Sequence, residues 1–399
     1  MAMTDAPPRP NRPVYLDNQA TTRCDPRVVQ AMLPYFSEEY GNPHSAEHIM
    51  GRTAEAAVET ARSRVAALIG AEAREIVFTS GATESNNIAI KGAARFAAGM
   101  GDPRRRIVTA ATEHKCVLEA VADLAAEGFE PVVLPVGPDG LLDPDTLRAA
   151  LTTPTLLVSV MTVNNETGTI QDIATLARLA KESGALFHTD AAQATGKIPL
   201  DLTRWNVDLA SVSGHKLYGP KGVGALFVRR RPRVRLLPLL SGGGQERGLR
   251  SGTLPAPLIV GLGEACRLAG EEMAAESERI AALRDALLTR LRRDIPGIQV
   301  NGDPVARIAG NLNLTFPGAT AAALMQADPD LCVSTGSACS SAAIEPSYVL
   351  RALGLSDGQA ERTLRIGIGR FTSAADIDYA ALALSAAHAT LAAQHPDTL

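Results

Sequence analysis

Residues 185–190 read ALFHTD, and residues 209–216 read LASVSGHK. Each stretch is a short apolar run that ends in polar residues, which is typical of a buried strand in a parallel sheet. Asp190 closes the first run, and Lys216 follows shortly after the second. Ligands of open α/β sheets bind where the strands end. The two stretches therefore predict two strands of one sheet with a carboxylate and a lysine at its functional edge.

The same alternation of helical periods and β-branched runs continues on both sides, from about residue 53 to residue 228. It predicts an α/β fold with a mostly parallel seven-stranded sheet that helices cover. The predicted strands are Glu75–Thr79, Arg106–Ala110, Pro131–Pro135, Leu156–Val163, Ala185–Asp190, Leu209–Ser213 and Gly224–Val228. The predicted helices between them are Thr53–Ile69, Glu84–Ala98, Cys116–Glu127 and Ile173–Ser183.

A Gly- and Pro-rich stretch, Ser241–Pro257, breaks this alternation, and a long helical pattern from Leu258 to Arg293 follows it. Beyond it the pattern predicts a smaller α+β domain with strands Asn311–Thr315 and Leu364–Ile368, a helix near Tyr348–Leu353 and an Ala-rich helix from Ala374. We expect an N-terminal segment over 1–20 that packs with the small domain. A large domain over 21–260 and a small C-terminal domain over 261–399 complete the expected division.

Composition excludes several classes of protein. The chain has 399 residues, enough for two or three domains at roughly 150 residues each. Its 43 acidic and 39 basic residues give a net charge of −4, which argues against a protein that mainly coats nucleic acid or anionic membrane. The five cysteines are an odd number in a long chain, so they indicate a reducing compartment and not a disulfide framework. Without a signal peptide or a long apolar run, we expect a soluble, cytoplasmic protein.

The stretch TSGATE (79–84) places a turn of small residues between a predicted strand and a predicted helix. The free amides of a helix N-terminus, with the hydroxyl of Thr83, form an anion site suited to a phosphate. An ordinary helix cap with Glu84 in the first turn is the alternative, and the motif alone does not separate the two.

Asp190 and Lys216 also have ordinary explanations when each is taken alone: a helix cap and a surface charge. Together with the phosphate turn, however, they are the parts that a pyridoxal phosphate site requires. The phosphate needs a helix N-terminus, the pyridine nitrogen needs a carboxylate, and the aldehyde needs a lysine with which it forms a Schiff base. This combination is far more specific than any of its members.

One cysteine has unusual neighbours. Residues 334–341 read STGSACSS, so Cys339 has only small and polar residues around it, where a thiolate can form and move. The other four cysteines are expected to pack as small hydrophobic side chains; they are Cys24, Cys116, Cys266 and Cys332.

Taken together, these motifs closely resemble the pyridoxal-phosphate-dependent cysteine desulfurases of the NifS/IscS type, which belong to the class-V aminotransferase family and have the type I fold of such transferases. The matching strings run nearly end to end: YLDN (15–18), ATT (20–22), FTSGATES (78–85), TEHK (112–115), VNNE (163–166), SGHK (213–216), RSGT (250–253) and GSAC (336–339). The loop around Cys339 resembles that of the housekeeping and nitrogen-fixation group.

The resemblance implies a role for each matching residue. Lys216 holds the cofactor, Asp190 is the partner of its pyridine nitrogen, and Gln193 binds its ring hydroxyl. His114 stacks on the ring and moves protons. The phosphate would be held by Ala82, Thr83, Ser213 and His215, and by Thr253 from the other subunit of a homodimer. Asn165 and Arg365 resemble the residues that bind the substrate carboxylate, for which the arginine offers two parallel hydrogen bonds.

The family's activity is the removal of sulfur from L-cysteine. By the resemblance, Cys339 attacks the substrate sulfur, so that alanine leaves and a persulfide stays on the enzyme. The sulfur then passes to acceptors, with an iron–sulfur scaffold protein in first place and other carriers, such as those that feed transfer RNA thiolation, beside it. The resemblance also implies that Cys339 transiently ligates a [2Fe–2S] cluster shared with the scaffold.

Two other functions are compatible with parts of this pattern. An aminotransferase or a kynureninase-like lyase would share the fold without needing a mobile cysteine. A catalytically silent scaffold subunit would keep the fold for protein contacts, but such a protein should lose at least one of Lys216, Asp190, His114 and Cys339, and all four are present.

Overall fold

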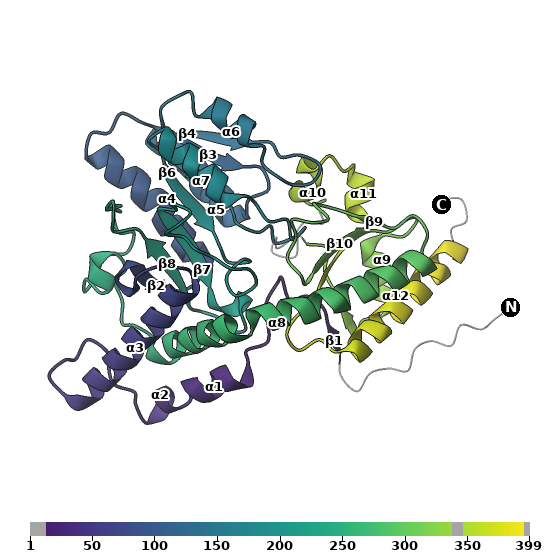
Figure 1. Cartoon of the computed structure of the whole chain (residues 1–399), viewed down its shortest axis with the longest axis horizontal. Helices are drawn as coiled ribbons and strands as arrows, with labels where there is room; N and C mark the ends of the chain where they lie inside the picture. The colour runs from purple at the N-terminus through teal and green to yellow at the C-terminus, as the bar shows by residue number, and fades with distance from the viewer. Residues whose placement is uncertain (1–12, 337–345, 395–399) are drawn as a thin grey trace.

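The computed structural model describes residues 13–336 and 346–394. These residues form two hydrophobic cores, one around a seven-stranded sheet and one around a smaller sheet nearer the C-terminus (Figure 1). The long helix α8 (Ala256–Asp294) runs along both and connects them.

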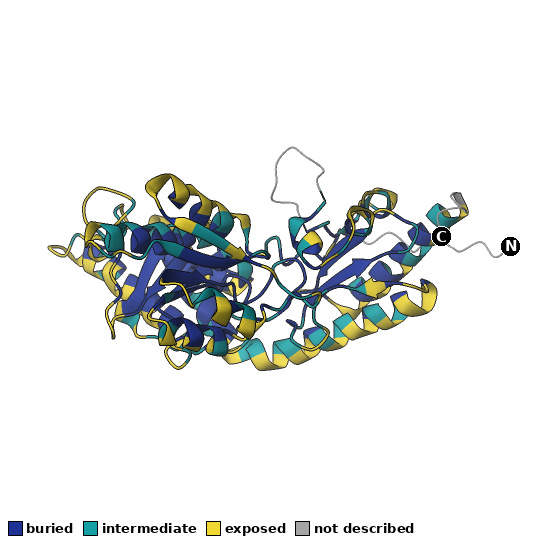
Figure 2. Cartoon of the chain, turned by 90° about the horizontal axis from the view of Figure 1, so that it is seen from above, coloured by how far each residue is buried: buried dark blue, intermediate teal, exposed yellow. Residues whose placement is uncertain are grey.

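The large sheet confirms the predicted fold class. Its strand order is β2-β8-β7-β6-β5-β3-β4, in which β8 is antiparallel to both neighbours and the remaining pairs are parallel. Its strands are β2 Ile76–Thr79, β3 Arg106–Ala110, β4 Glu130–Leu134, β5 Thr155–Ser159, β6 Leu186–Asp190, β7 Leu209–Ser213 and β8 Gly224–Val228. Apart from the edge strand β4, the strand residues are almost all buried, as Figure 2 shows in dark blue, because helices cover the sheet.

The helices around this sheet begin where the sequence supplies caps. Asp172, for example, accepts a hydrogen bond from the amide of Thr175 at 3.1 Å and starts α7, whose buried residues recur at helical spacing. The helices are α1 Pro26–Met32, α2 Pro34–Ser37, α3 Ile49–Leu68, α4 Ala82–Gly99, α5 Lys115–Asp123, α6 Pro144–Ala150 and α7 Ile173–Glu182. Short 3-10 helices occur at Ala73–Glu75, Leu124–Glu127, Gly214–Lys216 and Glu246–Gly248.

The smaller C-terminal region contains the antiparallel sheet β12-β10-β9 and the parallel pair β1-β11. Its elements are β1 Val14–Tyr15, β9 Gln299–Val300, β10 Asn311–Thr315, α9 Ala321–Ala327, β11 Leu331–Cys332, α10 Tyr348–Ala352, α11 Asp357–Glu361, β12 Thr363–Gly367 and α12 Ala374–Gln394. Val14 and Leu16, near the start of the described chain, are buried in the core of this region.

Several predicted boundaries were wrong. The strand predicted over 156–163 ends at Ser159. Beyond it the amide of Met161 donates to the buried carboxylate of Glu113 and not to a neighbouring strand. The helix predicted over 116–127 is α5 followed by a 3-10 turn. Helices α1, α2 and α6 were not predicted, because they are four to seven residues long and too short to show a helical period.

Candidate active site

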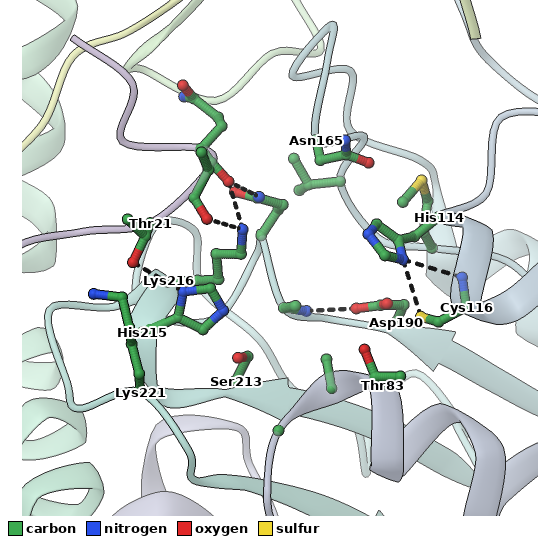
Figure 3. Close-up of a pocket in the computed structure, with 18 of the residues that line it drawn as sticks. Thr21, Thr83, His114, Cys116, Asn165, Asp190, Ser213, His215, Lys216 and Lys221 are labelled. Atoms are coloured by element: carbon green, nitrogen blue, oxygen red, sulfur yellow. Dashed lines mark hydrogen bonds between the residues drawn. The ribbon is translucent and has the colours of Figure 1, made fainter. Parts of the chain in front are cut away.

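A cavity of about 600 Å³ opens where the strands of the large sheet end (Figure 3). Nearly all the residues predicted for the site line it, although they come from distant parts of the chain. They are Ala82, Thr83, His114, Asn165, Asp190, Gln193, Ser213, His215, Lys216 and Arg365. Thr253 is exposed on the loop before α8 and does not line this cavity. Cys339 lies outside the described residues, and so does its predicted role as a cluster ligand.

The predicted phosphate turn connects β2 to α4. Gly81 precedes the helix with a φ of +149° and has no side chain to cap it, so the first turn of α4 starts at the cavity with its amides available. The side chain of Glu84 does not cap these amides, because its carboxylate accepts from the amide of Ser80 at 2.7 Å and pairs with Arg250 at 2.8 Å. The helix N-terminus therefore retains its preference for an anion.

Lys216 reaches the cavity from the 3-10 turn that follows β7. Its amine donates to the backbone oxygens of Gln19 and Ala20, each at 2.6 Å. The next residues of this N-terminal segment support His215, whose Nδ1 lies 3.0 Å from the hydroxyl of Thr21. Burial, followed by the charge of Lys216, lowers the pKa of His215 to about 4, so the ring is neutral at pH 7. The ATT motif thus holds the segment that carries the lysine.

Asp190 is the last residue of β6, and both of its carboxylate oxygens accept hydrogen bonds. One accepts from the amide of Ala192 at 2.9 Å, and the other accepts from the side-chain amide of Asn86 at 2.7 Å. Asn86 also donates to the sulfur of Cys116 at 3.1 Å, which in turn lies 3.0 Å from Nδ1 of His114. This chain of contacts fixes Asp190 and His114 relative to each other.

Cys116 was predicted only to pack as a small hydrophobic side chain, and the structure corrects this. It packs partly against a small apolar cluster, as predicted, but its side chain also lines the cavity beside His114 (Figure 3). His114 caps α5 through Nδ1, which accepts from the amide of Cys116 at 3.2 Å. In the neutral ring the proton therefore sits on Nε2. Cys266, by contrast, is buried in the large core as expected.

Arg365 comes from β12, in the smaller region, and its side chain is only 3% exposed. Its guanidinium pairs with Asp17 at 2.8 Å and donates to the backbone oxygen of Asn165 at 3.1 Å. Two buried atoms at this point have no hydrogen-bond partner among the described residues: Nε of Arg365 and the side-chain oxygen of Asn165. Buried polar atoms need partners, so this corner of the cavity is suited to a small polar ligand.

The residues on either side of the 337–345 segment meet at Glu166. A Cβ atom on Gly336 would lie 2.8 Å from a carboxylate oxygen of Glu166, and the hydroxyl of Ser347 donates to that same oxygen at 2.6 Å. Burial raises the pKa of Glu166. Since Glu166 follows Asn165 in the chain, Gly336 and Ser347 both lie beside the wall of the cavity.

Comparison with known proteins identifies the family. Residues 14–380 match the family described as aminotransferase class-V. The chain belongs to this family. Within the class-V aminotransferases it groups with the NifS/IscS-type cysteine desulfurases, as the motifs predicted. It is 53% identical over 371 residues to "Cysteine desulfurase IscS" of Rickettsia felis, an alignment that covers 93% of this chain and 90% of the relative. It is 57% identical to "Cysteine desulfurase, mitochondrial" of Arthroderma benhamiae, covering 92% and 73%.

Two solved structures are also similar to this chain. A "NifS-like protein" superimposes with a TM-score of 0.86 at 36% identity, covering 95% of this chain and 99% of that one. The structure titled "SspA in complex with cysteine" gives a TM-score of 0.79 at 37% identity, covering 90% and 99%. No helix within residues 13–336 and 346–394 is both long and apolar enough to cross a bilayer.

Proposed function

We propose that this class-V aminotransferase relative is a cysteine desulfurase, which removes sulfur from L-cysteine to leave alanine and a persulfide on Cys339. The observation that carries the proposal is the convergence of Lys216, Asp190, the α4 N-terminus and Arg365 on one cavity. Its named relatives with 53% and 57% identity are cysteine desulfurases. This supports the same chemistry here, with pyridoxal 5′-phosphate as the cofactor.

The residues of the cavity fit that cofactor. The uncapped start of α4, at Ala82 and Thr83, would hold the phosphate together with Ser213 and His215. Asp190 is held ready for a pyridine nitrogen by two hydrogen bonds. Gln193 would bind the ring hydroxyl, His114 would cover the ring face, and Lys216 would bond to the aldehyde. When bound, the cofactor supplies an electron sink for negative charge that develops at the substrate Cα.

The protein's own groups then carry out the reaction. The guanidinium of Arg365 and the amide of Asn165 bind the substrate carboxylate and fix its orientation. The amine of Lys216 takes the proton from Cα, and the ring of His114 is placed to move protons. The thiolate of Cys339 forms a bond to the substrate sulfur while the carbon–sulfur bond breaks. Its electron pair stays with the carbon, which gains one proton to become the methyl group of alanine, and Cα regains the proton that Lys216 removed.

We propose further that the persulfide sulfur goes to an iron–sulfur scaffold protein and to other carriers, including those for transfer RNA thiolation. We also propose that Cys339 transiently ligates a cluster shared with that scaffold.

Thr253, which is exposed and away from its own cavity, would contact the phosphate in the second subunit of a homodimer. The site is proposed to work in the cytoplasm. The division at 1–20, 21–260 and 261–399 remains our proposal for the domains, supported by the two hydrophobic cores.

Two variants test the proposed activity. Lys216→Ala should abolish the yellow absorbance band of the cofactor-loaded protein and all turnover of L-cysteine. Cys339→Ala should keep the band but lose persulfide formation. If Cys339→Ala releases sulfide and alanine from cysteine as fast as the unaltered protein, the site is that of a lyase without a cysteine nucleophile. If the unaltered protein binds no pyridoxal phosphate, a silent scaffold is the better description.

A further inference from the structure

The side chain of Gln193 accepts a hydrogen bond from a lysine that does not line the main cavity. Lys197 lies four residues further along a turn with helical hydrogen bonding, and its amine donates to Oε1 of Gln193 at 2.7 Å. Lys197 borders a separate space of about 30 Å³, which Gln19, Tyr218 and Glu276 also line. Its hydrogen bond toward the residues of the main cavity is the one to Gln193.

The contacts of Gln193 leave one orientation for its amide. A lysine ammonium has only donors, so the group that faces Lys197 is the oxygen of the amide. The nitrogen faces the backbone oxygen of Gln19, which can only accept, at 2.8 Å. Reversing the amide would place two donors together on one side and two acceptors together on the other. The amide nitrogen carries a second hydrogen, and Gln193 lines the cavity.

The surroundings of Lys197 make its amine easier to deprotonate than that of an exposed lysine. Burial, and then the positive charges of Lys216 and Arg365, lower the pKa of Lys197 to about 7, against the opposing effect of Glu276. The phenol of Tyr218 is the other titratable group that borders the same small space. A neutral amine still carries two N–H groups, so Lys197 can donate to Oε1 of Gln193 in either protonation state.

We propose that Lys197 is a positioning residue that fixes the polarity of the Gln193 amide, so that an N–H and not an oxygen is presented to the ligand in the main cavity. This rests on the proposed function, in which that ligand is pyridoxal phosphate and the acceptor is its ring oxygen. An N–H donor favours the deprotonated, anionic form of that oxygen. Lys197 thereby helps to set both the affinity for the cofactor and the protonation of its ring oxygen.

The test compares the dissociation constant of pyridoxal phosphate and the pH titration of its absorbance band in four proteins: unaltered, Lys197→Met, Gln193→Ala and the double variant. Lys197→Met should raise the dissociation constant about five- to tenfold, the loss of roughly one hydrogen bond. It should also move the titration of the band to higher pH. Gln193→Ala should do the same, and the double variant should be no weaker than Gln193→Ala, because both changes remove one interaction.

A matched control is Lys91→Met, which removes a lysine paired with Asp123 on the surface of the large domain. It should leave the affinity and the titration unchanged. If Lys197→Met fails to fold, Lys197→Gln, whose shorter side chain does not reach Gln193, replaces it. Additive losses in the double variant, or a Lys197 variant with unaltered affinity and titration, would overturn the inference. Failure of the unaltered protein to bind the cofactor would instead overturn the proposed function.

Discussion

The buried pair between Arg62 and Glu246 should be a major source of stability. Arg62, on α3, makes two hydrogen bonds of 2.8 Å to the two carboxylate oxygens of Glu246, and the side chains are 4% and 2% exposed. Glu246 also accepts from the amide of Phe78, in β2. The pair thus ties the loop that carries Thr253 to the strand that leads into the predicted phosphate turn.

Replacing Arg62 by Met leaves a buried carboxylate without its charge partner. Such a loss costs about 3–5 kcal/mol, which agrees with two charge-assisted hydrogen bonds at about 1.5–3 kcal/mol each. We expect the free energy of unfolding, measured by urea denaturation at fixed protein concentration, to fall by that amount. Arg62→Met combined with Glu246→Gln should recover about 1–2 kcal/mol relative to the sum of the single changes, because the glutamine is neutral and can still accept from Phe78.

The matched control is Arg95→Met. Arg95 also makes a bidentate contact to a carboxylate, that of Glu127, but both side chains are 36% exposed. Since exposed pairs contribute about 0–1 kcal/mol, this variant should lose less than about 1 kcal/mol. A loss for Arg62→Met no larger than that for Arg95→Met, or a double variant without recovery, would show that the buried pair is not a major source of stability.

Two further predictions concern pH and backbone conformation. Burial lowers the pKa of His188 to about 3, so the unfolded chain binds more protons than the folded one below about pH 6.5. Stability should therefore fall as the pH drops from about 6.5 to 3, and His188→Gln should flatten this slope in urea denaturation series, whereas exposed His44→Gln should not. Gly336 and Gly354 have φ of +85° and +89°, but only Gly336 would place a Cβ against Glu166. Gly354→Ala should cost about 1–2 kcal/mol and Gly336→Ala clearly more; equal losses in the free energy of unfolding would contradict this.

The sequence predicted the large sheet well because its strands are short buried runs with clear breaks, such as LASVS before Gly214. The edge that carries Asp190 and Lys216 followed from the same pattern, since parallel strands end on one side. Element ends were less predictable where a side chain interrupts the ladder. The amide of Met161 bonds to Glu113, 48 residues away in the chain, and no local pattern reports such a contact.

The residues hardest to predict from the sequence were those that support the site through contacts with other side chains. Cys116 has the sequence context of a packed cysteine, and only the tertiary structure brings it to His114 and Asn86. Lys197 has the context of a surface lysine, although its spacing of four residues from Gln193 places both on one face of a helical turn, which is a usable signal. The ion pair of Arg365 with Asp17 joins residues near opposite ends of the chain.

In the proposed reaction, Cys339 receives the sulfur of L-cysteine. The most direct measurement is mass spectrometry of the peptide that contains Cys339, after the cofactor-loaded protein has reacted with L-cysteine without a reductant or acceptor. We expect a gain of one sulfur atom on that peptide, one alanine released for each persulfide formed, and neither product from Lys216→Ala. Alanine released with no added sulfur on Cys339, or with the sulfur on Cys116 in the unaltered protein, would contradict it.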